Sequence, residues 1–381
     1  MVQDFFPQGI AKGQSFIGRE EEVTRLKKNI AAGHHTLLIA PRRYGKTSLA
    51  QNVISGLGIL NNDVNFFLCR NGEAVERKIR ACIAQALGKD DDLQEKVFSS
   101  LRDFFKHSKK KWTFGFKGVA GVELTPDDSD DVAGNIYTAL TVLESTLNDL
   151  GKKAVLFFDE VQEIDLLDDG RQLQGAIREF AQISQHVVFI FSGSNRRLLH
   201  HMFDDSSMPL YELCEREQLH KISVNTYRAY LNHVASKTFD SPIDDSVLEA
   251  IFSITERHPK RVYNLCYQLW NDHPEGNYTV DIVKEAWDSL LKMRVKDVRG
   301  KLSNLNNSQL AVLTFIATGN DTLVTSRDAQ NKVNLSSAAI VKAIRYLEDE
   351  DFIEKHVEGN FALIDPLIKD VLVKYENHTG N

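Results

Sequence analysis

The first part of the chain alternates between short apolar runs and stretches in which apolar residues recur every three or four positions. The second pattern covers residues 75–87 and 135–150 and predicts amphipathic helices. The short runs are largely continuous, which is typical of strands buried on both faces of a parallel sheet between layers of helices. We therefore predict a doubly wound α/β domain up to about residue 225. Its strands are expected at residues 36–40, 65–69, 154–158 and 187–191, with the last strand of the sheet at 219–224.

Between residues 89 and 131 the α/β pattern is interrupted. Trp112, Phe114 and Phe116 alternate with other residues, and glycines separate the short segments, which predicts an inserted β-hairpin. Residues 225–295 then show an entirely helical pattern.

The last part of the chain, residues 305–366, predicts a winged helix. In DNA-binding versions of this unit the third helix enters the major groove. Residues 348–351 are acidic, which suits DNA poorly, and winged helices also serve as packing and protein-contact modules. Both interpretations stay open. The helices are expected at residues 308–318, 328–333 and 337–348, the wing strands at 352–355 and 360–363, and the exposed candidates of the third helix are Ser337, Lys342, Arg345 and Tyr346.

A phosphate-binding loop follows the first predicted strand. Residues 40–47 (APRRYGKT) match the pattern G-x-x-x-x-G-K-[ST] except that Ala40 replaces the first glycine. Such a loop turns backbone N–H groups toward phosphates in front of a helix N-terminus. Lys46 would place its charge on the β- and γ-phosphates of ATP, and the Thr47 hydroxyl would ligate Mg²⁺. The predicted nucleotide-binding residues of the loop are Pro41, Arg42, Arg43, Tyr44, Gly45, Lys46, Thr47 and Ser48.

Two further predicted strands end in polar residues. Asp159 and Glu160 follow the run at 154–158, and we assign Asp159 to Mg²⁺ and Glu160 to the attacking water as its general base. Ser192 follows the run at 187–191 and is our first candidate for contact with the γ-phosphate or the water. Ser194 and Asn195 are the next candidates, and either is equally suited to cap the following helix.

Composition narrows the class of protein. Hydrophobic residues make up 42% of the 381 residues and charged residues 26%, which excludes a mainly disordered chain. The longest apolar runs are far shorter than the roughly 20 residues of a membrane span, and residues 1–12 show no secretory pattern. The four cysteines are widely spaced, without a metal-binding pattern. We expect a cytoplasmic protein with reduced thiols and no membrane partner.

The charge is unevenly distributed. Residues 1–117 carry 20 Lys and Arg against 12 Asp and Glu, whereas residues 118–299 carry 18 against 30. The basic part either binds a polyanion or faces an acidic surface of the same protein. The densest basic segment runs from Lys106 to Trp112, and it could grip double- or single-stranded DNA, or form a solvated loop.

Together, the ordered motifs resemble the archaeal-type ATPases of the AAA+/STAND group, and at greater distance the origin-recognition ATPases. The resemblance covers about residues 16–372. It implies an AAA+-like P-loop core at 1–224, with the hairpin inserted at about 89–131, a helical lid at 225–299 and a winged helix at 300–381. The motifs that carry it are FIGRE at 16–20, APRRYGKTS at 40–48, FFDEVQEI at 157–164, FSGSNRR at 191–197 and MPLY at 208–211.

The resemblance also implies roles for residues outside the loop. Arg261, in the segment HPKR at 258–261, looks like a lid arginine that reads the γ-phosphate, although His258 stands where this family usually has glycine. Arg216 resembles an arginine finger that acts on the nucleotide of a neighbouring subunit. The residues that would contact the adenine-ribose side are Phe16, Ile17, Gly18 and Arg19.

Three functional classes follow. The first is an ATPase that binds ATP with Mg²⁺ and hydrolyses it, so that the nucleotide state sets the lid and assembles partners, including DNA or further copies of the chain. The second is a signalling or scaffold switch with protein partners and little turnover. The third, a small-molecule kinase, shares the loop, but the lid and winged-helix order points away from it.

Overall fold

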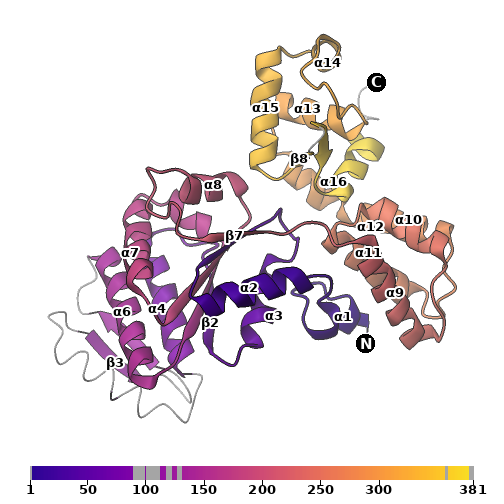
Figure 1. Cartoon of the computed structure of the whole chain (residues 1–381). Coiled ribbons are helices and arrows are strands. Elements are labelled where there is room, and N and C mark those ends of the chain that lie inside the picture. The colour runs from indigo at the N-terminus through magenta and orange to yellow at the C-terminus, as the bar shows by residue number, and fades with distance from the viewer. Residues whose placement is uncertain are drawn as a thin grey trace. The chain divides into compact units, whose positions relative to one another are not determined.

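The computed structural model describes residues 2–88, 99, 112–116, 122–126, 131–356 and 359–376. It forms two compact units (Figure 1). The sheet unit comprises Glu20–Ala40 and Lys46–Leu219. The helical unit comprises Met1–Arg19, Pro41–Gly45 and His220–Asn381, so that five residues of the phosphate loop belong to it. The three-part division at residues 224 and 299 stays a prediction.

The sheet unit is built on a five-stranded sheet in the order β2-β5-β6-β1-β7, with every neighbouring pair parallel. Long apolar runs form its centre, and all residues of β5 and β6 are buried. This confirms the predicted doubly wound parallel sheet of P-loop type. The strands are β1 (Thr36–Ile39), β2 (Leu60–Asn65), β5 (Ala154–Asp159), β6 (Val187–Gly193) and β7 (Glu215–Gln218).

Helices cover both faces of this sheet. One face carries the main apolar core, in which Phe158, Phe189 and Phe191 pack against four helices. Because side chains alternate along a strand, the opposite face of the sheet receives the other two helices. The core face is covered by α4 (Gly72–Gly88), α6 (Val132–Leu150), α7 (Gly170–Ile183) and α8 (Arg196–Asp204), the other by α2 (Glu20–Ala32) and α3 (Lys46–Ser55).

Two strand predictions are wrong. β2 ends at Asn65, where residues 65–69 had been expected to form the strand, and Phe67 and Leu68 are exposed in the turn that follows. The last strand is β7, and not residues 219–224. Both β2 and β7 are edge strands of the sheet, and their exposed positions carry polar residues. A search for continuous apolar runs therefore does not find them.

The inserted hairpin is confirmed for its two strands. β3 (Trp112–Phe116) pairs antiparallel with β4 (Val122–Pro126), and Phe114 lies opposite Leu124. The basic residues from Lys106 to Lys111 and the acidic residues 127–130 lie outside the described residues.

The helical unit surrounds one apolar core. Phe6, from the segment after α1 (Val2–Phe5), packs edge-on against Tyr230, Tyr263 and Trp270. None of the helices in the described part of the chain has the length and apolarity needed to cross a bilayer. The other elements of the unit are η1 (Gly13–Ser15), α9 (Val224–Phe239), α10 (Asp245–Thr255), α11 (Pro259–Asp272), α12 (Val280–Leu302), α13 (Asn307–Ala317), α14 (Arg327–Val333), α15 (Ser337–Asp349), β8 (Ile353–Lys355), β9 (Phe361–Leu363), α16 (Pro366–Val371) and η4 (Leu372–Glu376).

From α13 onward, three helices and an antiparallel pair of strands follow in the order that the sequence predicts. Assignment of this segment as a winged helix stays a prediction.

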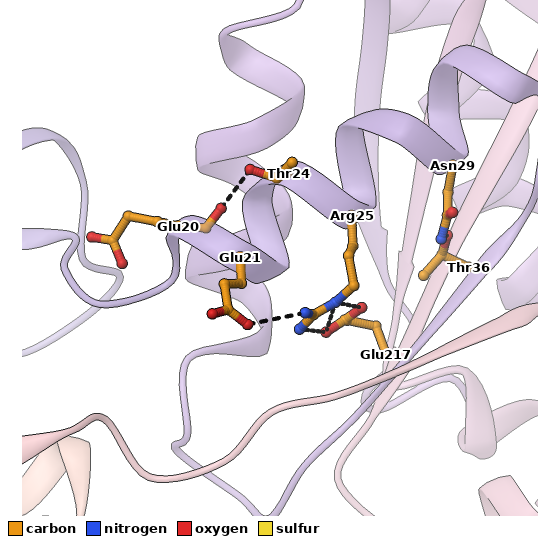
Figure 2. A network of polar contacts seen from close by, with 7 residues as sticks. All are labelled: Glu20, Glu21, Thr24, Arg25, Asn29, Thr36 and Glu217. Carbon is orange, nitrogen blue, oxygen red and sulfur yellow. Dashed lines mark hydrogen bonds and ion pairs between the residues drawn. The ribbon is translucent and has the colours of Figure 1, made fainter.

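Ion pairs fix the edge strand β7 from both faces. On one face, Glu217 accepts hydrogen bonds from Arg25 of α2, with Nη2–Oε1 at 2.7 Å and Nε–Oε2 at 2.9 Å (Figure 2). Arg25 is also within 3.3 Å of Glu21, one helical turn earlier. On the other face, Arg216 pairs with Asp204 of α8. β7 is therefore tied to both helical layers.

Replacement of Glu217 by alanine is expected to lower the free energy of unfolding by about 1–2 kcal/mol, because a charged, bidentate hydrogen-bonded pair is lost from a buried carboxylate. Urea unfolding of the wild type and the variant measures the effect. Glu215→Ala is the control, since Glu215 is an exposed side chain of the same strand and should change stability little. Equal stability of both variants would contradict the anchoring role of Glu217.

Candidate active site

The carboxyl ends of the parallel strands bring the predicted polar residues of the sheet unit together. Asp159 is the last residue of β5, and Ser192 lies near the end of the neighbouring strand β6. Lys46 and Thr47 begin α3, which follows β1 on the other side of β6. Open parallel sheets bind ligands at this edge.

Asp159 is the centre of this cluster. Its Oδ2 accepts a hydrogen bond from the Thr47 hydroxyl at 2.9 Å, and its Oδ1 accepts one from the Ser192 hydroxyl. The backbone N–H of Glu160 donates to Oδ1 at 3.1 Å, and the Asn65 amide donates to Oδ2 at 3.4 Å. Donors from three neighbouring elements therefore converge on one buried carboxylate.

The cluster contains Asn65, which the sequence analysis missed. Asn65 is the last residue of β2, and its Oδ1 accepts a hydrogen bond from the N–H of Phe67 at 2.8 Å. The available signal was a polar residue at the end of a strand beside β5, but the misplaced strand at 65–69 concealed it.

Glu160 is held by a separate set of donors. Its Oε2 accepts hydrogen bonds from the hydroxyl of Ser194 at 2.7 Å, the N–H of Ser194 at 3.0 Å and the amide of Gln162 at 2.7 Å. The residue has φ 55°, in the left-handed region that side chains rarely adopt, at the start of the 3₁₀ helix η3 (Val161–Leu166). Asp159 and Glu160 thus have different partners although they are adjacent in sequence.

The structure separates the three candidates at the end of β6. The Ser192 hydroxyl contacts Asp159, and the Ser194 hydroxyl contacts Glu160. The Asn195 side chain accepts a hydrogen bond from the N–H of Leu198 at 3.0 Å and caps α8. Ser192 and Ser194 therefore both face the carboxylates, whereas Asn195 has the structural role.

Lys46 lies at the first position of α3 and is buried. Its Nζ donates to the carbonyl oxygen of Ala40 at 2.7 Å, so that the two ends of the phosphate loop are joined. Ser48, the last predicted loop residue, is buried two positions further along the helix. Gly45 has φ 93°, a conformation that a side chain would strain, and this explains the glycine directly before Lys46.

Loop residues 41–45 contact the N-terminal segment within the helical unit. Arg19 donates from Nη2 to the carbonyl oxygen of Tyr44 at 3.1 Å. Gly18 has φ 66°, and a Cβ there would lie 2.7 Å from Cγ2 of Ile222. The glycine therefore permits a close approach of this segment to the residues before α9. Phe16 and Ile17, the other predicted adenine-side residues, are partly buried beside it.

His258 is buried directly before α11, and its ring lies edge-on to that of Tyr44 with centroids 5.2 Å apart. Its Nδ1 has no hydrogen-bond partner among the described residues. Burial is the main cause that lowers the pKa of this side chain to about 4; the charge of Asp365 opposes the shift and that of Arg261 adds to it. His258 is therefore a neutral residue of the core at neutral pH.

Arg261 is buried and paired with a carboxylate that the sequence analysis did not single out. Its Nε donates to Oδ1 of Asp365 at 2.7 Å, and its Nη2 donates to Oδ2. Burial works to raise the pKa of Asp365, but the hydrogen bonds and charge of Arg261 lower it overall. The available signal was the pair Asp365-Pro366, which is typical of a helix start, and Asp365 does cap α16.

The predicted finger residue Arg216 has its partners at the end of α8. It extends from β7, pairs with Asp204 and donates to the carbonyl oxygen of Phe203 at 3.5 Å. Its side chain is 46% exposed, so that it is accessible from outside the sheet unit.

Thr47 and Asp159 offer the oxygen donors that Mg²⁺ prefers, at the position where the loop meets β5. Within the described residues no group of three or more His, Cys, Asp or Glu side chains could hold a metal by itself. Mg²⁺ is usually bound through one or two carboxylates together with substrate phosphates and water.

A parallel sheet with this loop after β1 and adjacent carboxylates at the end of a central strand defines the fold of a P-loop ATPase. The model of the ATPase domain found predominantly in Archaea matches residues 16–265, and the chain belongs to this family. No curated protein sequence matches the chain.

Solved structures show the same fold. A Walker-type ATPase of Pyrococcus abyssi superposes with a TM-score of 0.70 at 15% sequence identity, covering 98% of this chain and 100% of that one. The Aeropyrum pernix ORC2 protein, in its ADPNP–ADP complexes, superposes with a TM-score of 0.56 at 13% identity, covering 99% and 98%. At this level of identity the likeness concerns the fold.

The free energy of unfolding is expected to fall as the pH decreases from 6.5 toward 4, because the unfolded chain binds a proton at His258 that the folded chain does not. The shift corresponds to about 3 kcal/mol over this range. Thermal unfolding at pH 7, 6 and 5 tests this. His258→Gln should show a weaker pH dependence than the wild type, and His220→Gln, at an exposed histidine, should not. Parallel pH profiles for all three proteins would contradict the assignment.

Proposed function

We propose that this ATPase binds ATP with Mg²⁺ at the strand edge and that its nucleotide state controls the helical lid and the assembly of partners. The observation that carries the proposal is the convergence of Thr47, Asp159 and Ser192 at the end of the loop, beside a second carboxylate, Glu160, with its own donors. A cytoplasmic location is part of the proposal.

In this proposal the residues divide the work by position. Lys46 and the N–H groups at the start of α3 bind the β- and γ-phosphates, and Thr47 and Asp159 hold Mg²⁺. When bound, Mg²⁺ neutralises charge that develops on the phosphate oxygens. Ser192 fixes Asp159 in orientation through its hydroxyl.

Glu160 is the proposed general base. It would accept a proton from the water that attacks the γ-phosphorus, and the bond to the β-phosphate oxygen breaks to release ADP and phosphate. Ser194 and Gln162 both donate to Oε2 of Glu160. To accept the proton, Glu160 must either turn Oε2 toward the water or use its other oxygen, Oε1. These donors therefore hold Glu160 until the substrate is in place.

Arginines supplement the loop in this proposal. Arg261 would contact the γ-phosphate from the lid, and Phe16, Ile17, Gly18 and Arg19 would lie on the adenine-ribose side. Arg216 would act on the nucleotide of a neighbouring copy, which is supported by its exposed position on an edge strand. That contact requires exchange of Asp204 for a phosphate.

DNA is the proposed partner of the first functional class. The basic segment from Lys106 to Trp112 supports it, as do the exposed residues Ser337, Lys342, Arg345 and Tyr346 on α15, the predicted recognition helix of a winged helix.

A specific observation favours the second class, a switch with protein partners. Asp351, in the acidic turn after α15, accepts a hydrogen bond from the N–H of Arg42 at 3.2 Å, so that this turn contacts the phosphate loop itself.

Glu160→Gln is expected to reduce ATP turnover by about 10²- to 10⁴-fold while ATP binding persists, because only the proton acceptor is removed. Steady-state phosphate release and nucleotide titration measure the two properties. Asp168→Asn, at an exposed carboxylate close by in sequence, is the matched control and should turn over like the wild type. Full turnover by Glu160→Gln would overturn the assignment of the base.

Double-stranded DNA is expected to stimulate turnover at low salt and to lose this effect at moderate salt, as phosphate contacts require. The triple variant Lys109→Glu, Lys110→Glu, Lys111→Glu should lose the stimulation. Lys27→Glu with Lys28→Glu reverses two exposed charges on α2 and is the control. Turnover that is indifferent to DNA in the wild type would favour the protein-partner switch.

A further inference from the structure

Two carboxylates of the C-terminal segment contact groups that are proposed to bind phosphate. Asp351 accepts a hydrogen bond from the backbone N–H of Arg42 in the phosphate loop at 3.2 Å. Asp365 accepts two hydrogen bonds from the guanidinium of Arg261, the first at 2.7 Å. All four residues belong to the helical unit, so that these contacts lie within one compact body.

Arg261 and Asp365 form a bidentate ion pair. The planar guanidinium presents two parallel N–H groups, which fit a carboxylate and a phosphate equally well. Both side chains are nearly buried, with 9% and 12% exposed. A phosphate that binds Arg261 through the same N–H groups must therefore displace Asp365.

Asp351 likewise occupies a donor that could bind phosphate, in this case the backbone N–H of Arg42. Phosphate loops bind their ligand through N–H groups that point into the loop, and a carboxylate oxygen is the closest chemical substitute for a phosphate oxygen. Asp351 itself has φ 55°, and it lies two residues after the end of α15. The turn conformation is thus the one that brings the carboxylate to the loop.

Cations near these contacts favour an anion at this place. Lys260 precedes Arg261 at the start of α11. Partial burial, together with the charges of Arg43 and Arg261, lowers the pKa of Lys260 to about 8. The loop and α11 therefore gather positive charges that repel one another, and both a carboxylate and a phosphate relieve this repulsion.

The two aspartates flank one structural element. Between them lie the strands β8 (Ile353–Lys355) and β9 (Phe361–Leu363), which pair antiparallel. Asp351 holds the chain before this hairpin against the phosphate loop, and Asp365 holds the chain after it against α11.

We propose that Asp351 and Asp365 are internal competitors of the nucleotide phosphates, and that a bound triphosphate displaces them and releases the β8–β9 hairpin from the loop and from α11. This inference rests on the proposed function, since it requires nucleotide at the phosphate loop. The outputs of the switch are then the polar contacts on either side of strands β8 and β9, which the two aspartates hold before the triphosphate binds and leave open to a partner afterwards, while Ile353 and Leu363 stay in the core.

Titration of the full-length chain with a fluorescent ATP or ADP analogue, in the Glu160→Gln background, tests the competition. Asp365→Asn should bind the ATP analogue roughly tenfold more tightly and change the affinity for the ADP analogue much less, because Arg261 is assigned to the γ-phosphate. Asp351→Asn should tighten the binding of both analogues. Asp370→Asn is the control, because Asp370 is a carboxylate on the same helix α16 that accepts a hydrogen bond from Trp287 at 2.6 Å.

Hydrogen exchange of the unaltered protein provides the second measurement, since Asp365→Asn leaves Arg261 without its partner and can destabilise the fold. The amides of β8 and β9 should exchange faster with a slowly hydrolysed ATP analogue than with ADP. Unchanged or slower exchange, together with affinities equal to those of Asp370→Asn, would overturn the competition.

Lys46→Ala separates this inference from the proposed function. Loss of nucleotide binding in this variant, with normal binding in the wild type, upholds the site at the loop whatever the aspartate variants show. Failure of the wild type to bind nucleotide would overturn both the proposed site and the competition.

Discussion

The active edge of the sheet depends on the single carboxylate of Asp159. Thr47 from α3, Asn65 from β2 and Ser192 from β6 all donate to its two oxygens. A parallel sheet places these strand ends at one edge, but it does not by itself fix the side chains. The shared acceptor does so, because each donor would otherwise lose a hydrogen bond to a charged, buried group. The position of the start of α3 relative to β5 follows from this one group.

In both units, acidic side chains at or near the proposed nucleotide site are held by hydrogen-bond donors of the same protein. In the sheet unit, Glu160 is held by Ser194 and Gln162. In the helical unit, Asp351 and Asp365 are held by Arg42 and Arg261. In the helical unit, each contact satisfies a donor that the proposed function assigns to a phosphate, whereas in the sheet unit Ser194 and Gln162 hold the proposed base itself. Exchange of one anion for another then requires less reorganisation than the creation of a new binding surface, since the donors are already oriented.

The fold followed from the sequence wherever burial is two-sided. The continuous runs of β5 and β6 identified the central strands, and the glycine-lysine-threonine loop predicted the phosphate site that remains a proposal. β2 and β7 were misplaced because edge strands carry polar residues such as Asn65 and Glu217. Ser192 and Ser194 could be named as candidates, but their separate partners depend on side-chain direction along β6.

The contacts of the helical unit could not be predicted in the same way. Arg42 and Asp351 are 309 residues apart in the chain, and Arg261 and Asp365 are 104 apart. Local patterns of hydrophobicity carry no information on such pairs. The charge imbalance of the N-terminal part gave a partial indication for the first pair only, since Arg42 of the basic loop contacts a carboxylate of the same protein through its backbone N–H, whereas Arg261 lies outside this part.

The polar composition of β7 also has a consequence for association between molecules. This strand lies at one edge of the sheet and consists of Glu215, Arg216, Glu217 and Gln218. The unpaired backbone groups of an edge strand can pair with a strand of another molecule. Ionised side chains on both faces make such joining costly, because an incoming strand would have to desolvate them. Copies of this protein that meet at β7 would therefore make contact through side chains and not by extending the sheet. Arg216 then stays accessible to a neighbouring copy.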